Sequence, residues 1–561
     1  MNKINPRLLG IIIFAGIVLV AIIIKISDNT NTPGDAPKTG NIIEITFLSS
    51  SAKKNWIDAM VKEFNDRGHM EGTKKIFITA LHGNSGEQLD QMKEGRLKPD
   101  LWSPGDESWL EMAASHWKMI KQKRLYEKYI PLVNIPLVIA MWEPMARALG
   151  YPQPIGWQEI ARLAASPNGW ASLNHPEWGK FRWGHAHPDA NSGFLSVISE
   201  IYAALNKRTG ITPGDLRKPE VVNFLKKIEG AVEHYGLSNS WIDDLMRSKG
   251  PAYLSCAVQY ENTIIESNEK SGNKPFKLVS IYPKEGCFWT QHPVAVLEEA
   301  WVTPDKQRAA GKFVEFLLSR DAQKAAMKLG MRPIMGGLEL GTPFDDEHGV
   351  IAKVDSGKKF TVPEEDVLKR IRDLWEDVKV PASIIMVLDR SGSMKGEALD
   401  NARTGAMEFI KNMKPRDRVK VVIFNHIITD LTDLCQVRDC KEIIINRLSS
   451  VFAEGNTALY DVTAKYFHEL KGLMAKEPNR RYGILLLSDG MDTQSRLDRH
   501  DFLDKFPKGE DFDVPKIYSI AYGKQADKNL LTEISNRTNA RVFTSSPEEI
   551  IKTYKELSAN F

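Results

Sequence analysis

The stretch of residues 383–394, SIIMVLDRSGSM, carries the clearest signal for the fold of the C-terminal part of the chain. Its first half is a nearly uninterrupted apolar run, which is typical of a central strand buried on both faces of a parallel sheet. Its second half places oxygen-bearing side chains at alternate positions, at Asp389, Ser391 and Ser393. Because Asp, Ser and Gly also fill ordinary turns, this stretch alone does not distinguish a turn from a metal site.

The sequence around this stretch repeats the same alternation of strand and helix. We expect further strands at DRVKVVIFNH, RYGILLLSDG and VPKIYSIAYG, with amphipathic helices between and after them. This order predicts one doubly wound, Rossmann-like α/β domain over 381–561. Thr457 opens one predicted helix, and Asp489 ends the predicted strand ILLLSDG. Since parallel strands end at the same edge of a sheet, we expect both to lie near Asp389.

The predicted site has only oxygen ligands, without a thiol or an imidazole. Such hard ligands favour Mg²⁺, with Mn²⁺ or Ca²⁺ as alternatives. The predicted metal ligands are Asp389, Ser391, Ser393, Thr457 and Asp489.

This pattern resembles the metal-ion-dependent adhesion site of von Willebrand factor type A (VWA) domains, and the resemblance extends over 381–561. It implies that the serine hydroxyls, and in many members the threonine hydroxyl, contact the metal directly, while the two aspartates act mainly through bound water. It also implies that an Asp or Glu carboxylate of a partner protein completes the coordination. The usual Gly-Gly-Thr is Gly455-Asn456-Thr457 here, and Arg390 should point to the rim or the opposite face.

A second series of strands and helices occupies 42–335. IIEITFLSS and IFITALHG read as strands, and helices are expected to begin at Ser85 and at Asn191-Ser192-Gly193. The N-terminus of a helix offers unpaired N–H groups to an anion or a polar ligand. Ser and Asn are also ordinary N-caps, so ligand binding and capping both stay open.

This region resembles the type II bacterial extracellular solute-binding proteins, the group that includes molybdate- and sulfate-binding members. The segments that carry the resemblance are KPDLWSPGDESWL (98–110), LVNIPLVIAM (132–141), GHAHPDANSGF (184–194), IYPKEGCFW (281–289) and the helical stretch 309–333. The family fold implies two α/β lobes joined by crossing strands, expected at LVNIPLVIA and around His292 to Glu298, with a small polar or anionic solute between the lobes. The ligand-binding candidates by position are Ser50, Ser51, Ser85, Asn191, Ser192 and Tyr260.

His185 and His187 lie in the loop GHAHPD, where two histidines could bind a metal. With no Cys or Glu at metal-ligand spacing around them, the sequence favours a structural role.

The N-terminus reads as a membrane anchor. Residues 8–24 contain no charged side chain and are flanked by Lys3, Arg7 and Lys25. We expect a cytoplasmic tip and uncleaved signal anchor over 1–26, and a polar linker over 27–41; a cleaved signal and a buried helix are the alternatives. This predicts a single-pass protein of the cell membrane, with its N-terminus cytoplasmic and its bulk extracellular or periplasmic. A connector with a charged helix at 363–379 is expected over 336–380.

The chain has four cysteines, which fit an oxidising compartment. We expect a bridge between Cys435 and Cys440 across a tight QVRD loop. Cys256 and Cys287 would then form a second bridge, and free thiols are the alternative.

The chain has 561 residues, too many for one core, and a net charge of only +3, which does not suggest nucleic-acid binding. We expect a non-enzymatic binding protein that captures a solute and docks a protein partner, and that serves an ABC permease or a sensing role. One alternative is an adhesion or envelope-assembly protein whose first domain is only a scaffold. A metal-dependent hydrolase is disfavoured, because the sequence has no G-x-S-x-G and no H-E-x-x-H motif.

Overall fold

A computed structural model describes residues 41–558 apart from 237, 271–275, 355–356 and 509–510. The predicted membrane anchor and most of the predicted linker lie outside these residues. Within the described part of the chain, none of the helices combines the length and the apolar character that a bilayer crossing requires.

The first lobe is built on a mixed sheet of strand order β2-β3-β1-β4-β12-β5, in which β1 is parallel to both of its neighbours. Alternate residues of β1 (Ile43, Ile45 and Phe47) are buried, so that one face of the strand packs under helices. The strands are β1 (Ile42–Ser50), β2 (Met70–Glu71), β3 (Lys74–Gly83), β4 (Leu101–Ser103), β5 (Tyr129–Ile130) and β12 (Val294–Val296). The helices are α2 (Lys54–Arg67), α3 (Ser85–Lys93), α4 (Glu107–Lys121), α11 (Pro304–Leu317) and α12 (Arg320–Lys328).

The second lobe has a mixed sheet of order β10-β6-β9-β7-β8, with β11 and β13 also paired to β6. Its strands are β6 (Val133–Trp142), β7 (Trp183–Ala186), β8 (Val232–Gly236), β9 (Cys256–Tyr260), β10 (Leu278–Ile281), β11 (Trp289–Thr290) and β13 (Arg332–Pro333). Its helices are α5 (Glu143–Ala148), α6 (Trp157–Ala164), α7 (Asn191–Leu205), α8 (Pro219–Glu229), α9 (Asn239–Lys249) and α10 (Glu261–Lys270).

The chain passes between the two lobes at the two stretches that the sequence predicted. It leaves the first sheet after β5 and enters the second at β6, and it returns between β11 and β12. The two crossings touch, because the N–H of Leu132 donates to the carbonyl oxygen of Gln291 at 3.2 Å. A third crossing, which was not predicted, follows α12 and ends at β13.

A buried ion pair lies at the end of this third crossing. The Arg332 guanidinium donates from Nε and Nη2 to the two carboxylate oxygens of Glu261, each at 2.7 Å. The two side chains are 7% and 0% exposed. This bidentate pair joins β13 to the start of α10.

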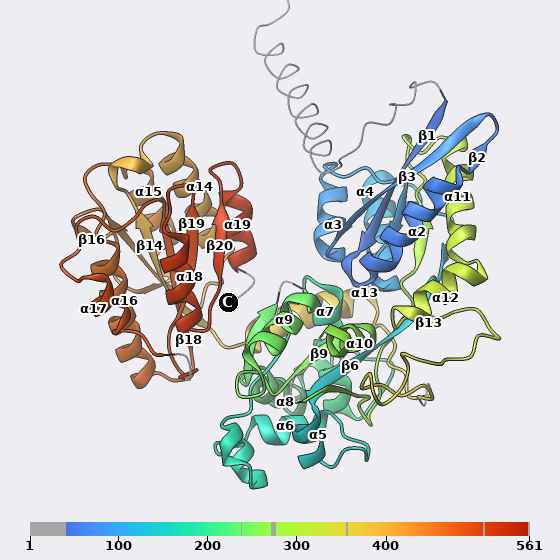
Figure 1. Ribbon diagram of the computed structural model, residues 1–561, viewed down its shortest axis with the longest axis horizontal. Helices are drawn as coiled ribbons and strands as arrows, with labels where there is room; N and C mark the ends of the chain where they lie inside the picture. The colour runs from blue at the N-terminus through green and yellow to red at the C-terminus, as the bar shows by residue number, and fades with distance from the viewer. Residues whose placement is uncertain (1–40, 237, 271–275, 355–356, 509–510, 559–561) are drawn as a thin grey trace, which may run out of the picture.

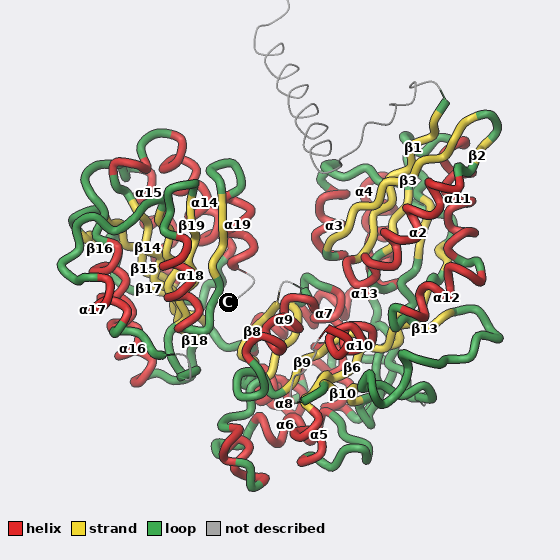
Figure 2. Tube along the Cα trace, in the orientation of Figure 1, coloured by secondary structure: helices red, strands yellow, loops and turns green. Residues whose placement is uncertain are grey.

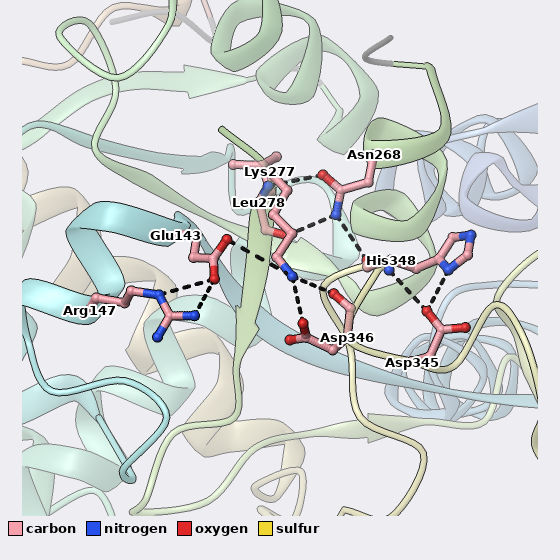
Figure 3. A network of polar contacts seen from close by, with 8 residues as sticks. All are labelled: Glu143, Arg147, Asn268, Lys277, Leu278, Asp345, Asp346 and His348. Atoms are coloured by element: carbon pink, nitrogen blue, oxygen red, sulfur yellow. Dashed lines mark hydrogen bonds and ion pairs between the residues drawn. The ribbon is translucent and has the colours of Figure 1, made fainter. Parts of the chain in front are cut away.

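The chain after β13 is held against the second lobe (Figure 3). The Lys277 ammonium contacts the Asp346 carboxylate at 2.9 Å, and the Asn268 amide donates to the carbonyl oxygen of His348 at 2.9 Å. Phe344 and Val350 bury their side chains in a small cluster beside α10. The connector therefore lies on the surface of the second lobe.

The predicted charged helix of the connector corresponds to α13 (Glu365–Val378). Val367, Leu368, Ile371 and Trp375 lie on one face of this helix, at helical spacing, and all four are buried in the large core of the lobes. The helix is therefore packed on the second lobe along its length, and only its outer face is charged.

The C-terminal domain has a sheet of order β16-β15-β14-β18-β19-β20, with β17 paired to β15, and helices on both faces (Figures 1 and 2). The predicted doubly wound arrangement is confirmed by two separate apolar cores, one on each face of the sheet. The strands are β14 (Ala382–Asp389), β15 (Arg418–Phe424), β16 (Ile428–Asp430), β17 (Cys435–Gln436), β18 (Arg481–Ser488), β19 (Lys516–Tyr522) and β20 (Val542–Ser545). The helices are α14 (Glu397–Asn412), α15 (Val437–Ser449), α16 (Leu459–Lys476), α17 (Arg499–Leu503), α18 (Lys528–Arg537) and α19 (Ile550–Ser558).

One of the two predicted disulfides is present. Cys435 and Cys440 are bridged, although the residues between them belong to β17 and to the first turn of α15 and do not form the expected loop. The second bridge was wrong: Cys256 and Cys287 are separate, buried thiols. Burial raises the pKa of the Cys287 thiol to about 12, so this thiol stays protonated at neutral pH.

We predict that Arg332→Leu destabilises the two-lobed region by about 3 kcal/mol, because it leaves the Glu261 carboxylate buried without its partner. Chemical denaturation followed by tryptophan fluorescence measures this change. Arg308→Leu is the control, since Arg308 forms an exposed pair with Glu71 and its loss should change stability little. Equal effects of the two substitutions would contradict a special role for the buried pair.

Candidate functional site

A cavity of about 460 Å³ lies between the two lobes. All six residues that the sequence proposed as ligand contacts line it: Ser50, Ser51, Ser85, Asn191, Ser192 and Tyr260. They come from both lobes, because β1 and α3 belong to the first and α7 and β9 to the second.

These residues meet because strands end, or helices begin, at the cavity. Ser50 is the last residue of β1, and Tyr260 is the last residue of β9. Ser85 and Asn191 are the first residues of α3 and α7. The ends of these elements therefore bring polar groups to one place, as is usual for ligand sites of open α/β sheets.

The two helix starts are not capped in the ordinary way. The residues that precede them, Asn84 and Ala190, make no side-chain capping hydrogen bond. Ser85, Asn191 and Ser192 lie inside the helices, so they are not N-caps. The positive ends of two helix dipoles consequently point toward the cavity, where they favour a negatively charged or strongly polar group.

Several of the predicted contacts already have partners within the protein. The Asn191 amide accepts a hydrogen bond from Trp109 Nε1 and donates one to the Tyr260 hydroxyl, both at 2.7 Å. The Ser85 hydroxyl oxygen accepts from the N–H of Gly105 at 3.0 Å. Trp109 belongs to the first lobe and Asn191 to the second, so the bond between these two also holds the lobes together, while the other two bonds lie within one lobe each.

Charged side chains that the sequence analysis missed complete the wall of the cavity. Four carboxylates and three cations line it: Asp243, Asp244, Glu266, Glu269, Lys54, Arg247 and Lys270. Many of them pair with one another, as Arg247 does with Asp243 at 2.8 Å. Most come from α9 and α10, whose charges look in the sequence like those of any solvated helix face. Only the packing of the second lobe turns them toward the cavity.

The second candidate site lies at the carboxyl edge of the C-terminal sheet. The Ser391 and Ser393 hydroxyl oxygens are 3.1 Å apart, and the Ser393 hydroxyl donates to the Asp489 carboxylate at 2.9 Å. The Asp389 carboxylate accepts from the N–H of Ser391 at 2.8 Å and from the Ser488 hydroxyl at 2.7 Å. Four of the five predicted ligands are therefore joined in one cluster.

Thr457 is brought to the same edge by its loop. The carbonyl oxygen of Gly455 accepts from the N–H of Gly392 at 2.9 Å, which pairs the loop before α16 with the loop after β14. Within the described chain the Thr457 hydroxyl makes no hydrogen bond to the other four side chains. The replacement of a glycine by Asn456 leaves this backbone pairing in place.

The electrostatics of the cluster fit a divalent cation. Asp389 is fully buried, and burial, reinforced by the neighbouring Asp489, raises the pKa of its carboxyl to about 6. Burial also raises the pKa of Asp489. Among the described residues no Lys, Arg or His forms an ion pair with either carboxylate, so a hard cation would supply the missing positive charge.

The neighbouring arginine does not fill this role. Arg390 forms an ion pair with Glu454 at 3.0 Å, and its guanidinium lies 5.7 Å from the centre of the exposed Phe452 ring. It points to the rim of the site, as the sequence predicted, and leaves the oxygen cluster without a positive side chain.

The carboxyl edge of the C-terminal sheet faces away from the two lobes. Arg481 and Lys516, the first residues of β18 and β19, contact the second lobe through the Val232 carbonyl oxygen and the Glu233 carboxylate, each at 2.7 Å. The oxygen cluster lies at the opposite end of the sheet, where β14 and β18 end. These contacts with the second lobe therefore do not involve the oxygen cluster.

The two histidines of GHAHPD do not act as a pair. His187 contacts Asp189 at 3.2 Å and packs its ring edge-on against Trp375. His185 is fully buried and lies 3.4 Å from Glu229. A metal site made by both histidines is therefore absent from this described loop.

Comparison with known families decides what kind of protein this is. Residues 45–332, slightly more than half of the chain, match the family model of the bacterial extracellular solute-binding proteins. The chain belongs to this family. Residues 383–556 match the von Willebrand factor type A domain. The predicted fold class, an α/β solute-binding domain followed by a VWA domain, is thereby confirmed.

Individual relatives are distant. The chain is 26% identical over 182 residues to an uncharacterized protein of Synechocystis sp.; the aligned region makes up 32% of this chain and 42% of the relative. It is 24% identical over 169 residues to inter-alpha-trypsin inhibitor heavy chain H1 of Bos taurus, where the aligned region makes up 29% of this chain and 18% of the relative. The chain therefore spans less than half the length of these curated relatives.

Solved structures show a similarly low likeness. The sulfate-binding protein SubI from Mycobacterium tuberculosis is 18% identical, with a TM-score of 0.37, over 55% of this chain and 92% of that one. A von Willebrand factor type A protein from Catenulispora acidiphila is 15% identical, with a TM-score of 0.29, over 32% of this chain and 43% of that one. Neither TM-score is high enough to support an argument about ligands.

The solute-binding domain has its lobes in contact at Gly86. A Cβ at this position would lie 2.7 Å from the Asp189 carbonyl oxygen of the second lobe and 2.9 Å from Trp109. We predict that Gly86→Ala holds the lobes apart and increases the radius of gyration in small-angle X-ray scattering. Gly311→Ala is the control, since a Cβ there meets no atom within 4 Å. Identical scattering of Gly86→Ala and the wild-type protein would contradict the closed contact.

Proposed function

We propose that this chain is a membrane-anchored, extracytoplasmic binding protein with two independent binding sites. Its solute-binding domain captures a small polar or anionic solute between the lobes, and its VWA domain binds a protein partner through a divalent cation. The observation that carries this proposal is the cluster of Ser391, Ser393, Asp389 and Asp489, whose carboxylates are drawn together without a cationic side chain. Such a cluster is arranged to hold a cation, and it lies on a free edge of the domain.

The proposed cation is Mg²⁺, with Mn²⁺ or Ca²⁺ as alternatives. Ser391, Ser393, Asp389, Thr457 and Asp489 would hold it, and when bound it would attract an Asp or Glu carboxylate of the partner. Within the domain, the buried Asp389 orients the loop through the N–H of Ser391, and Asp489 orients the Ser393 hydroxyl. The chemistry proposed here is binding, without catalysis.

The charges around the cavity narrow the class of solute. The two uncapped helix starts favour anionic or strongly polar groups, while the carboxylates of α9 and α10 outnumber the cations that line the same cavity. We therefore propose a small polar solute that is either neutral or has its negative charge confined to one group. Delivery of such a solute to an ABC permease, or its detection at the membrane, would use the closing of the two lobes.

A second candidate function has an observation of its own. The polar groups of Asn191, Tyr260 and Ser85 already have hydrogen-bond partners within the protein and need no ligand. This is expected of a domain that serves only as a scaffold. In that case only the VWA domain binds a partner, in adhesion or envelope assembly.

For the metal site, we predict that the wild-type chain binds Mg²⁺ in isothermal titration calorimetry and that Asp389→Ala and Thr457→Ala weaken this binding at least about tenfold, because each removes an oxygen of the site. Glu442→Ala, an exposed carboxylate on α15 of the same domain, is the matched control and should bind as the wild type does. Unchanged Mg²⁺ binding in both site variants would rule out the proposed site.

For the cavity, a thermal-shift screen of the full chain against oxyanions, sugars and amino acids separates the two candidate functions. Under the proposal at least one compound raises the melting temperature of the wild-type chain, and Ser192→Ala reduces the shift while Asp389→Ala does not. If no class of compound changes the melting temperature, the solute-binding domain is a scaffold.

A further inference from the structure

A cluster of three ionisable side chains lies in the core of the second lobe, away from the cavity and from the VWA metal edge. His185 comes from β7, Glu200 from α7 and Glu229 from the last turn of α8, and each side chain is 0% exposed. One ligand atom from each residue lies within 4.8 Å of the others. The sequence analysis considered His185 as a metal ligand but did not connect it with the two glutamates, because the three residues lie on different elements and meet only in the folded lobe.

Each residue uses one polar atom in a hydrogen bond and leaves the other without a partner. His185 Nδ1 contacts the Ala186 carbonyl oxygen at 2.8 Å, and Glu200 Oε1 accepts from the Ser196 hydroxyl at 3.2 Å. Glu229 Oε2 accepts from the Tyr235 hydroxyl at 2.7 Å and from Trp375 Nε1 at 3.1 Å. The second atom of each, His185 Nε2, Glu200 Oε2 and Glu229 Oε1, is buried and has no hydrogen-bond partner.

The contact of His185 with a carbonyl oxygen determines what its second nitrogen does. A carbonyl oxygen only accepts, so Nδ1 carries a proton, and Nε2 is the ring atom that is left to bind a cation. This nitrogen and one oxygen of each carboxylate face one another. A metal-bound histidine characteristically donates its other N–H to a carbonyl oxygen, which is the arrangement found here.

The spacing and the charge of the cluster also fit a metal ion. His185 Nε2 and Glu229 Oε1 are 3.4 Å apart, which is long for a hydrogen bond between them. Two ligands at about 2.1 Å from a tetrahedral ion are themselves about 3.4 Å apart. Two carboxylates and a neutral imidazole balance one divalent cation. In the described chain no Lys or Arg forms an ion pair with either glutamate, and the basic side chain that contacts Glu229 is His185, at 3.4 Å.

We propose that His185, Glu200 and Glu229 bind a structural divalent transition-metal ion, with Zn²⁺ as the expected occupant. The mixed nitrogen and oxygen donors favour Zn²⁺ over Mg²⁺ or Ca²⁺, which prefer oxygen alone. Because all three side chains are fully buried, the ion is enclosed as the lobe folds and has no route to a substrate.

This ion would tie together the elements that surround the cluster. It joins the sheet at β7 to α7, whose first turn lines the cavity, and to the end of α8. Trp375 extends the cluster to α13, the last helix before the VWA domain, through its bond to Glu229.

The alternative is that the cluster holds no metal and that a shared proton keeps its three side chains together. In that case, burial and the neighbouring Glu229 keep the pKa of Glu200 well above its usual range, and Glu200 stays neutral.

The test is the metal content of the full chain after saturation with Zn²⁺ and removal of loosely bound ions by desalting. Inductively coupled plasma mass spectrometry should find about one Zn²⁺ per wild-type chain. Glu200→Gln, which keeps the shape of the side chain, should lower this content about tenfold or more, as should His185→Gln. His234→Gln, a buried histidine outside the cluster, and Glu442→Ala, an exposed carboxylate on α15, should retain the zinc.

The melting temperature gives a second readout that needs no variant. Removal of metal from the wild-type chain with a chelator should lower it, and Zn²⁺ should restore it. A wild-type chain that retains no zinc, and that melts identically with and without the chelator, would overturn the proposal. A Glu200→Gln chain as stable as the wild type would then identify the cluster as one held by a shared proton.

Discussion

Both candidate sites of this protein lie where parallel strands end together at one edge of a sheet. In the solute-binding domain β1 ends at Ser50, and α3 starts just beyond the end of β3, so that hydroxyl groups and a helix terminus meet at the cavity. In the VWA domain β14 and β18 are parallel neighbours, and their ends bring Asp389 beside Ser488 and Asp489. The buried, apolar strands fix the backbone, and the polar residues that follow them gather at the edge of the sheet.

The two domains are also joined by packing. Helix α13 is buried on the second lobe, and β14 begins only a few residues after it ends. Glu233 of the second lobe lies against Lys516 of the VWA domain, and although burial opposes ionisation, Lys516 helps to lower the pKa of Glu233 to about 2. The Tyr253 hydroxyl adds a bond to the Asn539 carbonyl oxygen at 3.0 Å. Packed side chains therefore connect the second lobe directly to the end of the VWA sheet at which β18 and β19 begin.

Much of this could be predicted from the sequence, because periodicity and strand-end residues are local signals. The strand at 382–389, the helix starts at Ser85 and Asn191 and the bridge between Cys435 and Cys440 are of this kind. Helix α15 was missed because its first turn was interpreted as a tight disulfide loop, although Val437, Cys440, Ile444 and Leu448 stand at helical spacing. The strands β16, β17 and β20 were missed because they are only two to four residues long. The acidic wall of the cavity and the cluster around Glu229 were missed for another reason: residues far apart in the chain meet there only through tertiary packing.

We propose that the oxygen atoms at the edge of the VWA sheet hold one divalent cation. Diffraction at the manganese absorption edge, from crystals of the full chain grown with Mn²⁺, locates such an ion without relying on a variant. We expect an anomalous peak about 2 Å from the hydroxyl oxygens of Ser391 and Ser393, facing Thr457 and the two aspartates. A map with no peak among these side chains, although Mn²⁺ is present in the crystal, would contradict it.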